Sequence, residues 1–314
     1  MARAIVYSEI GSPDVLHLAE IPDPVAGDGQ VVVRIEAVGV NPLDAKLRRG
    51  LRPGPPITAP RRVGFDGAGT ITALGEGVTG FSVGDRVAIR TTLGTYATAI
   101  AVPVSHIARL TDGVTTAEGA GIGIPVGTAY QVLRSLHVRK GDTLLVHAGS
   151  GAVGQAIVQY AVLWGATVIA TASPARFEQL QALGATPVAY GPGLTERVRE
   201  PAPGGVTVAI DCIGTDEAIE TSLALVADHD RIATIVRGPD AAALGIRAFS
   251  GGSPTPLTDE EESWRAEALP LTINLIEAGD FQIELGPELP LAEAARAHEL
   301  VEQHAARGKI ILIP

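Results

Sequence analysis

Hydrophobic residues follow two different patterns along the chain. Up to about residue 120, β-branched residues form short runs such as "QVVVRIEAVGV" and "YATAIAV", separated by Gly, Pro and Asp, which predicts a β-rich domain. From about residue 125, short apolar runs alternate with longer amphipathic segments, as in "TLLVHA", "AVGQAIVQYAVLWG" and "TVIATA". Such alternation of strand and helix is typical of an α/β protein with a Rossmann-type, doubly wound parallel sheet. Two helices and a final strand, "KIILIP", are predicted after about residue 265.

The stretch from Thr143 to Ala175 contains no Asp, Glu, Lys or Arg, so a membrane-spanning segment has to be considered. Glycines, a proline and polar residues interrupt it, and its apolar runs are shorter than the roughly 20 residues that cross a bilayer. A buried strand, turn, helix and second strand explain the same pattern, because strands of a parallel sheet are covered on both faces. The sequence therefore predicts a buried part of the sheet here.

Three glycines in "VHAGSGAVGQ" have the GxGxxG spacing and fall between a predicted strand and a predicted helix. Gly149 would allow a tight turn, Gly151 would let the backbone approach a pyrophosphate, and Gly154 would let helix and strand pack closely. The alternative is a packing turn that binds nothing, but the strand–turn–helix context favours a nucleotide site. The helix start would present its dipole and backbone amides to the anion. The residues that complete this candidate site are Ser150, Ala152 and Val153.

The end of the second predicted strand bears on the choice between NADH and NADPH. An NAD site places an Asp or Glu there to hold the ribose 2′-hydroxyl, but this chain has Thr171, Ala172 and Ser173. Arg176 follows, and its planar guanidinium could pair with a 2′-phosphate. The alternative for Arg176 is an ordinary solvated side chain. The missing acid and the nearby arginine together favour NADPH.

Composition narrows the possible partners and location. The chain has 314 residues, enough for two domains, and a formal net charge of -11. This charge opposes binding to a nucleic-acid backbone or an anionic membrane, so a small-molecule substrate is expected. The single cysteine, Cys212, cannot form an intramolecular disulfide, and the amino terminus lacks the basic and apolar regions of a secretory signal. We therefore expect a cytoplasmic protein.

Five segments in one order give a more specific signal than the glycines alone. They are "VNPLDAKLRRG", "RRVGFDGAGTITALGEGVTGFSVGDRVAI", "GIPVGTAYQVL", "HAGSGAVGQAIVQYAVLWGATVIATAS" and "ARGKIIL". With them the chain resembles the quinone oxidoreductase (zeta-crystallin-like) branch of the zinc-free medium-chain dehydrogenase/reductase superfamily. The resemblance implies a β-rich, GroES-like catalytic domain over residues 1–121, completed by 265–314, and a Rossmann dinucleotide-binding domain over 122–264. It also implies an active site in the cleft between the domains, and a homodimer formed through the nucleotide-binding domains.

Zinc-dependent alcohol dehydrogenases of the same superfamily resemble the chain at two places that decide the chemistry. Where they carry a Cys this chain has Asn41, and where they carry a His–Glu pair it has Phe65 and Asp66. Neither Asn41 nor Phe65 offers the thiolate or imidazole usual for zinc, and one cysteine cannot build a four-cysteine site. No metal is therefore expected. Without a Lewis acid, hydride transfer requires an acceptor that is already electrophilic, such as a quinone or an α,β-unsaturated carbonyl compound.

The resemblance also implies roles for individual residues. Asn41 would lie beside the nicotinamide and the substrate, and Thr128 would support the nicotinamide end of the cofactor. Lys46 stands where several quinone reductases carry a Tyr, and is either a donor to the developing oxyanion or a solvated lysine. The predicted function is NADPH-dependent reduction of a quinone or enone; the alternative is an NADPH-binding structural or redox-sensing protein with little activity. The positions that hold the 2′-phosphate in this family are Ser173, Arg176 and Tyr190.

Overall fold

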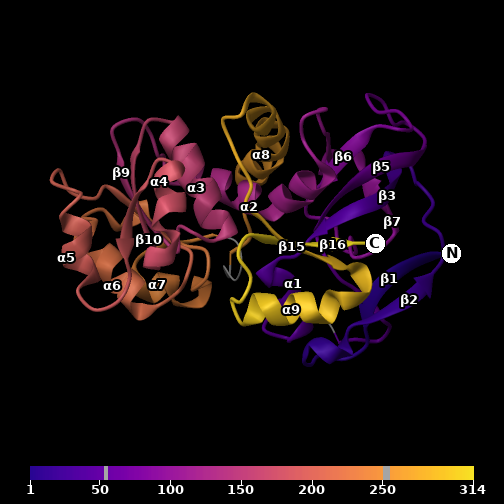
Figure 1. The fold of residues 1–314 in the computed structure, drawn as a ribbon, viewed down its shortest axis with the longest axis horizontal. Helices are drawn as coiled ribbons and strands as arrows, with labels where there is room; N and C mark the ends of the chain where they lie inside the picture. Colours follow the sequence, from indigo (N-terminus) through magenta and orange to yellow (C-terminus); the bar gives the residue numbers. More distant parts are fainter. Residues whose placement is uncertain (53–55, 250–254) are drawn as a thin grey trace. The chain divides into compact units, whose positions relative to one another are not determined.

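The computed structural model describes residues 1–52, 56–249 and 255–314. They form two compact units. Unit 1 comprises Met1–Ile124 and Leu269–Pro314, and unit 2 comprises Pro125–Ala268. Figure 1 shows the helices and strands of each unit. Two long helices, α2 (Thr116–Ser135) and α8 (Asp259–Ala278), contain residues of both units.

Unit 1 is built on a seven-stranded sheet in which neighbouring strands are antiparallel except for β15 and β16. Its long strand β3 (Gln30–Gly39) pairs with β5 (Asp66–Leu74), and Val31, Val33 and Ile35 of β3 enter the hydrophobic core. β-Branched residues suit these positions because their stiff side chains pack well on a pleated surface. The other strands of this sheet are β15 (Leu285–Pro290), β16 (Lys309–Ile313), β6 (Arg86–Ile89), β7 (Ala99–Pro103) and β8 (Ile107–Arg109).

A smaller sheet and two helices complete the part of unit 1 that supports the site. Strand β1 (Ala2–Tyr7) pairs antiparallel with both β2 (His17–Ile21) and β4 (Arg61–Arg62). Helix α1 (Pro42–Arg48) begins with a proline, whose missing N–H would have no partner in the first helical turn. Helix α9 (Ala294–Glu302) packs against α1. The helix predicted near the end of the chain is thereby confirmed.

Unit 2 has the predicted doubly wound α/β fold, with six parallel strands in the order β11-β10-β9-β12-β13-β14. From the neighbouring strands β9 (Thr143–His147) and β12 (Val208–Asp211), the chain continues in opposite directions across the sheet. Folds of this kind bind ligands in the crevice at the carboxyl ends of two such strands. The other strands are β10 (Thr167–Ala172), β11 (Thr186–Ala189), β13 (Ile232–Thr234) and β14 (Arg247–Ala248), and the helices are α3 (Ala152–Leu163), α4 (Phe177–Ala182), α5 (Leu194–Arg199), α6 (Asp216–Leu225) and α7 (Ala241–Leu244).

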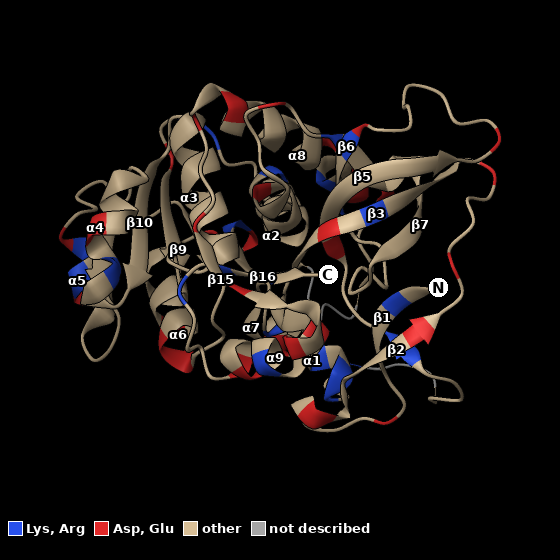
Figure 2. Cartoon of the chain, turned by 45° about the vertical axis from the view of Figure 1, so that its right-hand side comes forward, with Lys and Arg blue, Asp and Glu red and all other residues tan. Residues whose placement is uncertain are grey.

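The uncharged stretch of the sequence forms the centre of this unit. It covers β9, α3 and β10, most of whose side chains are buried. Figure 2 shows β9 and β10 without charged residues, as burial on both faces of a parallel sheet requires. Within the described ranges, no helix is both long enough and apolar enough to cross a membrane.

One helix differs from the sequence-based expectation, and another begins with a 3₁₀ turn. Helix α2 is continuous over 20 residues and was not predicted, because the glycines and the proline of "EGAGIGIPVG" normally interrupt helices. Close packing explains at least one of these glycines: a Cβ on Gly123 would lie 2.3 Å from an Asp66 carboxylate oxygen. The segment after Ser173 begins as a 3₁₀ turn, Pro174–Arg176, and continues as α4. Gly184, with φ +89°, lies just past the end of this helix.

Candidate functional site

The glycine-rich turn follows β9 and is fixed to the end of β10. The backbone N–H groups of Ala148 and Gly149 donate to the hydroxyl and carbonyl oxygens of Thr171, at 3.1 and 2.9 Å. Gly149 was predicted to allow the tight turn, but the residue with a left-handed backbone is Ala148, with φ +55°. A non-glycine residue rarely adopts this conformation, so the two hydrogen bonds to Thr171 help to hold it.

The three glycines have different amounts of space around them. A Cβ on Gly149 would lie 2.6 Å from the Cβ of Ala170 in β10, and one on Gly154 would lie 2.3 Å from the Ala148 carbonyl oxygen. Both glycines are therefore required for close packing of the turn, as predicted for Gly154. A Cβ on Gly151 would meet only the Ala148 carbonyl oxygen, at an ordinary 3.5 Å. The space beside Gly151 leaves room for a ligand to approach the backbone.

Within the described residues, the first backbone N–H groups of α3 have no hydrogen-bond partner, and they lie beside this space. Gly151 is the residue that precedes the helix, with φ −76° and ψ 165°, and it has no side chain that could accept from the first-turn amides. Those amides include Ala152 and Val153, and both Gly151 and Ala152 are exposed. Unpaired N–H groups and the positive end of the helix dipole attract an anion. The turn therefore fits the pyrophosphate of a dinucleotide.

The candidate 2′-phosphate residues lie near this turn. Ser173 and Tyr190 directly follow β10 and β11, two strands that pair with each other. A guanidinium nitrogen of Arg176 lies 3.5 Å from the Ser150 carbonyl oxygen, so Arg176 reaches the glycine-rich turn. Tyr190 is 61% exposed and is free to contact a ligand. Thr128, the residue expected at the nicotinamide end, is buried on α2.

In unit 1, the Asn41 side chain is buried and hydrogen-bonded at both ends of its amide. Nδ2 donates to Asp66 Oδ2 at 2.9 Å and to the Gly39 carbonyl oxygen at 3.3 Å. Oδ1 accepts from Nζ of Lys309, which lies 4.0 Å from Asp66 Oδ2. The same Asp66 oxygen accepts from the backbone N–H of Ile124 at 2.8 Å. Residues of β5, β16 and α2 thus meet around Asn41.

Asp44, Tyr96 and His298 extend this network. Asp44 Oδ2 accepts from the backbone N–H of Asn41 at 2.9 Å and from the Tyr96 hydroxyl at 3.0 Å. The Tyr96 hydroxyl also lies 3.3 Å from Nε2 of His298, and the two rings pack edge to face. Burial, with the Asp66 carboxylate nearby, raises the pKa of Asp44 to about 7. Burial lowers the pKa of His298 to about 3, so its ring is neutral at pH 7.

Burial also acts on the charged groups around Asn41. It raises the pKa of Asp66 and lowers the pKa of Lys309, while attraction between the two groups opposes both shifts. Lys46, on α1, is half-buried, and burial and the nearby Arg52 lower its pKa. Its ammonium group therefore releases a proton more readily than an exposed lysine, a property that suits a proton donor.

Lys309 and His298 are the members of this network that the sequence analysis did not single out. Lys309 directly precedes the apolar run "IILIP". That position was a usable signal, since a charge at the start of a buried strand needs a partner. Nothing in the sequence separates His298 from a solvated histidine on an amphipathic helix. Its burial is decided by packing against Tyr96.

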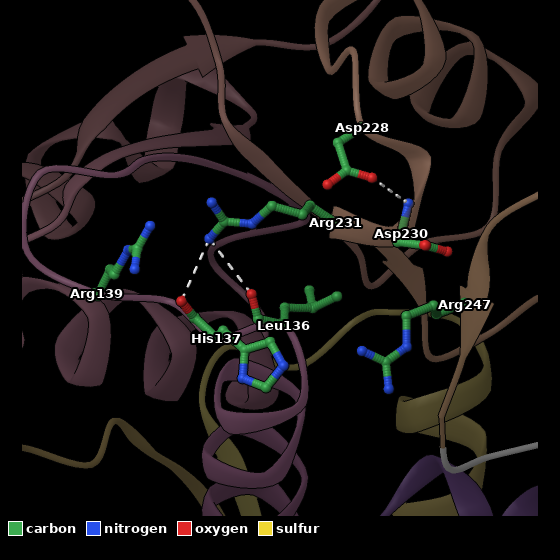
Figure 3. A pocket seen from close by; sticks show the side chains of 7 residues that line it. All are labelled: Leu136, His137, Arg139, Asp228, Asp230, Arg231 and Arg247. Atoms are coloured by element: carbon green, nitrogen blue, oxygen red, sulfur yellow. Dashed lines mark hydrogen bonds between the residues drawn. The ribbon is translucent and has the colours of Figure 1, made fainter.

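A surface cavity of about 870 Å³ lies at a different edge of unit 2 (Figure 3). Arg231 pairs there with Asp142 at 2.9 Å, and Figure 3 shows it directed at the carbonyl oxygens of Leu136 and His137. Arg231 and Asp142 immediately precede β13 and β9, whereas the glycine-rich turn follows the carboxyl end of β9. The cavity is therefore separate from the candidate nucleotide site. Its lining residues are Leu136, His137, Arg139, Asp228, Asp230, Arg231 and Arg247.

The chain is similar in sequence and structure to known dehydrogenases and quinone oxidoreductases. Residues 27–132 match the alcohol dehydrogenase GroES-like domain family, and residues 183–312 match the zinc-binding dehydrogenase family. The chain is 33% identical to a quinone oxidoreductase of Pseudomonas aeruginosa, over 100% of both chains. A mycobacterial protein solved in complex with NADPH has 32% identity and a TM-score of 0.83, over 99% of this chain and 100% of its own. The Escherichia coli quinone oxidoreductase complexed with NADPH has 25% identity and a TM-score of 0.84, over 99% and 100%.

The donor groups around Asn41 do not fit the zinc ion for which the second matching family is named. They are an amide, a carboxylate and the ammonium group of Lys309, which would repel a metal cation. Within the described parts of the chain, no three His, Cys, Asp or Glu side chains are grouped so as to bind a metal ion. The glycine-rich turn, in contrast, has the open space and free amides that a dinucleotide needs.

Proposed function

Because the chain belongs to the quinone oxidoreductase family of the medium-chain dehydrogenases/reductases, it is an oxidoreductase, and we propose that it transfers hydride from NADPH to a quinone or an α,β-unsaturated carbonyl compound without a metal ion. The observation that carries the cofactor assignment is the approach of Arg176 to the glycine-rich turn. The strand that ends beside it, β10, is followed by Ser173 rather than by an acid. An acid there would repel a 2′-phosphate.

Residues of unit 2 would bind the cofactor. The free amides at the start of α3, beside Gly151, would hold the pyrophosphate, and Ser173, Arg176 and Tyr190 would hold the 2′-phosphate. Thr128 would support the nicotinamide end. When bound, NADPH supplies the hydride, and the protein's task is to orient it against the acceptor and to exclude water.

The proposed acceptor follows from the donor groups in unit 1. Among the described residues, the side chains bonded to the Asn41 amide are the Asp66 carboxylate and the Lys309 ammonium group, neither a thiolate nor an imidazole, so a carbonyl that needs a metal to polarise it is a poor substrate. Quinones and enones spread the incoming charge onto an oxygen without such help. Asn41 and Lys46 are the residues we propose to act on the acceptor side. Lys46 would donate a hydrogen bond or a proton to that oxygen.

A panel of acceptors tests this function. Purified protein is mixed with NADPH or NADH and with benzo-, naphtho- and phenanthrenequinones or acyclic and cyclic enones, and loss of reduced cofactor is followed by absorbance. We expect turnover with at least one of these compounds and preference for NADPH. Normal NADPH binding with no turnover for any acceptor would favour the alternative, an NADPH-binding structural or redox-sensing protein.

Replacing the arginine tests the cofactor assignment separately. Arg176→Ala should weaken NADPH binding by about 1.5 to 3 kcal/mol, the range for a hydrogen bond to a charged group, and leave NADH binding nearly unchanged. Dissociation constants from fluorescence titration measure both effects. Arg199→Ala, at an exposed arginine on α5, is the matched control. Equal losses for NADPH and NADH in Arg176→Ala would contradict contact with the 2′-phosphate.

The proposal extends to assembly and location. The family resemblance implies a homodimer formed through the nucleotide-binding part, and the single cysteine fits a reducing cytoplasm. Sedimentation velocity of the purified chain measures the first directly, with a dimer mass as the expected result.

A further inference from the structure

The contacts of Lys309 suggest a role that the proposed function does not include. We propose that Lys309 is a positioning residue, which together with Asp66 holds the Asn41 amide in one orientation and makes Asn41 a hydrogen-bond acceptor toward a bound ligand. The inference rests on the proposed function only for the nature of that ligand. The orientation of the amide concerns this chain alone.

The two neighbours decide which end of the Asn41 amide is oxygen. A carboxylate accepts hydrogen bonds and an ammonium group donates them. The amide end that lies 2.9 Å from Asp66 Oδ2 must therefore be nitrogen, and the end beside Lys309 must be oxygen. Turning the amide over would place two acceptors together at one end and two donors together at the other. Lys309 and Asp66 thus favour the same single orientation.

The remaining hydrogen-bonding capacity of Asn41 follows from these contacts. Both hydrogens of Nδ2 are used, one by Asp66 and one by the Gly39 carbonyl oxygen. Oδ1 has two lone pairs, and Lys309 occupies one of them. The backbone N–H of Asp44 also faces the Asn41 side chain, within the capping box that the two residues form. A ligand group at Asn41 would share the remaining capacity of Oδ1 with this N–H. A ligand group that meets Asn41 is therefore a donor, such as an amide N–H or a hydroxyl. The oxygen that gains charge on the acceptor has to be bonded by another residue.

The fold makes room for Lys309 at this place. Its side chain is almost fully buried, and a Cβ on Gly39 would lie 3.0 Å from its Cε. A Cβ on Gly121 would lie 3.5 Å from its Cγ. Glycines of β3 and α2 thus border the path along which the side chain reaches Asn41. Burying an ammonium group is unfavourable unless it is paired, so Asp66 and Asn41 compensate for the burial of this charge.

Hydrogen exchange of the asparagine side chains tests the orientation without any turnover. The chain has two asparagines, Asn41 and the exposed Asn274, so labelling with ¹⁵N-asparagine gives two side-chain amide signals. The Asn41 hydrogens should exchange at least about tenfold more slowly than those of Asn274, because they are buried and bonded. In Lys309→Met they should exchange about tenfold faster than in the wild-type chain and shift, since the amide then loses the contact that holds its oxygen end. Lys140→Met, at an exposed lysine of unit 2, is the matched control and should change neither signal.

Turnover provides the second readout. Lys309→Met should lower kcat about ten- to a hundredfold, the effect of losing a charged hydrogen bond, and change the KM for NADPH less. Lys309→Arg, which keeps a positive donor, should recover part of kcat. A double variant, Lys309→Met with Asp66→Asn, removes both buried charges, so it should regain folding stability but neither kcat nor slow exchange.

Two results would overturn the positioning role. One is an unchanged Asn41 signal in folded Lys309→Met. The other is recovery of kcat and slow exchange together with stability in the double variant, which would mean that Lys309 only balances the charge of Asp66. If the wild-type chain shows no turnover, the proposed function fails, and the exchange measurement still decides the role of Lys309.

Discussion

At the scale of single residues, the neighbours of a side chain determine what it can do. Asn41 stands at the sequence position where zinc-dependent alcohol dehydrogenases carry a cysteine. In the folded chain its amide is held between Asp66 and Lys309, and Asp44 accepts from its backbone N–H. The sequence showed that no cysteine stands at this position. The internal partners of the amide come from β5 and β16, which are distant in the chain, and no local pattern shows that these two residues meet at Asn41.

Asp44 provides a test of this buried network through pH. Its pKa is about 7 in the folded chain and near 3.8 when unfolded, so the folded state binds the extra proton between these values. The contribution of Asp44 to stability should therefore fall as pH rises from about 4 to 7, by about 4 kcal/mol at most. In Asp44→Asn this contribution should be missing. Urea unfolding of both proteins at several pH values measures it.

Other groups change the folding stability over the same pH range in the opposite direction. Burial lowers the pKa of His147 to about 4 and that of His298 to about 3, so both histidines add stability as pH rises toward 6.5. The difference between wild type and Asp44→Asn isolates the carboxyl group. Asp280→Asn, at an exposed carboxylate of unit 1, should leave the wild-type slope in place. An identical slope in Asp44→Asn would show that Asp44 is ionised throughout.

At the scale of elements, glycines decide how closely helices and strands approach. The glycines of α2 lie within a continuous helix, which was not predicted, and the lack of a side chain at Gly123 admits the Asp66 carboxylate. The glycines before α3 were predicted to lie between a strand and a helix, and the structure confirms that position. Helix breaking by glycine is a weak preference of about 1 kcal/mol, which tertiary packing overcomes.

Two alanine substitutions separate packing from ligand access at this turn. In Gly154→Ala the new Cβ would lie 2.3 Å from a backbone oxygen, so unit 2 must shift and lose about 1 to 3 kcal/mol of stability. In Gly151→Ala the Cβ has ordinary contacts and φ is −76°, so stability should change by less than about 0.5 kcal/mol. NADPH binding should weaken in both. Thermal unfolding and fluorescence titration measure the two effects, and normal NADPH affinity in Gly151→Ala would contradict a pyrophosphate beside this residue.

At the scale of the whole molecule, the chain separates its tasks between two units. The residues that fit a dinucleotide belong to unit 2, and the buried network around Asn41 belongs to unit 1. The two segments of unit 1 are far apart in the sequence, since β16 and α9 follow unit 2 in the chain. Asn41 and Lys309, which contact each other in unit 1, are therefore separated in the sequence by the whole of unit 2.

Cofactor binding should stabilise the protein by mass action. A ligand present at about 100 times its dissociation constant adds about 2.7 kcal/mol to the free energy of unfolding. NADPH should therefore raise the Tm of the chain, and NADH at the same concentration should raise it less, because it lacks the 2′-phosphate. Differential scanning fluorimetry measures both shifts. In Arg176→Ala, the NADPH shift should fall to that of NADH; equal shifts in the wild-type chain would contradict NADPH preference.

The sequence by itself determined the α/β class, the doubly wound unit and the position of the glycine-rich turn. These features depend on local periodicity and on residues that are neighbours in the chain, so they can be read without coordinates. The tertiary structure decided the left-handed Ala148, the continuity of α2 and the network of Asn41, Asp66 and Lys309. Those features arise where strands and helices from distant parts of the chain meet, and the burial that shifts the pKa of a side chain exists only after they have packed.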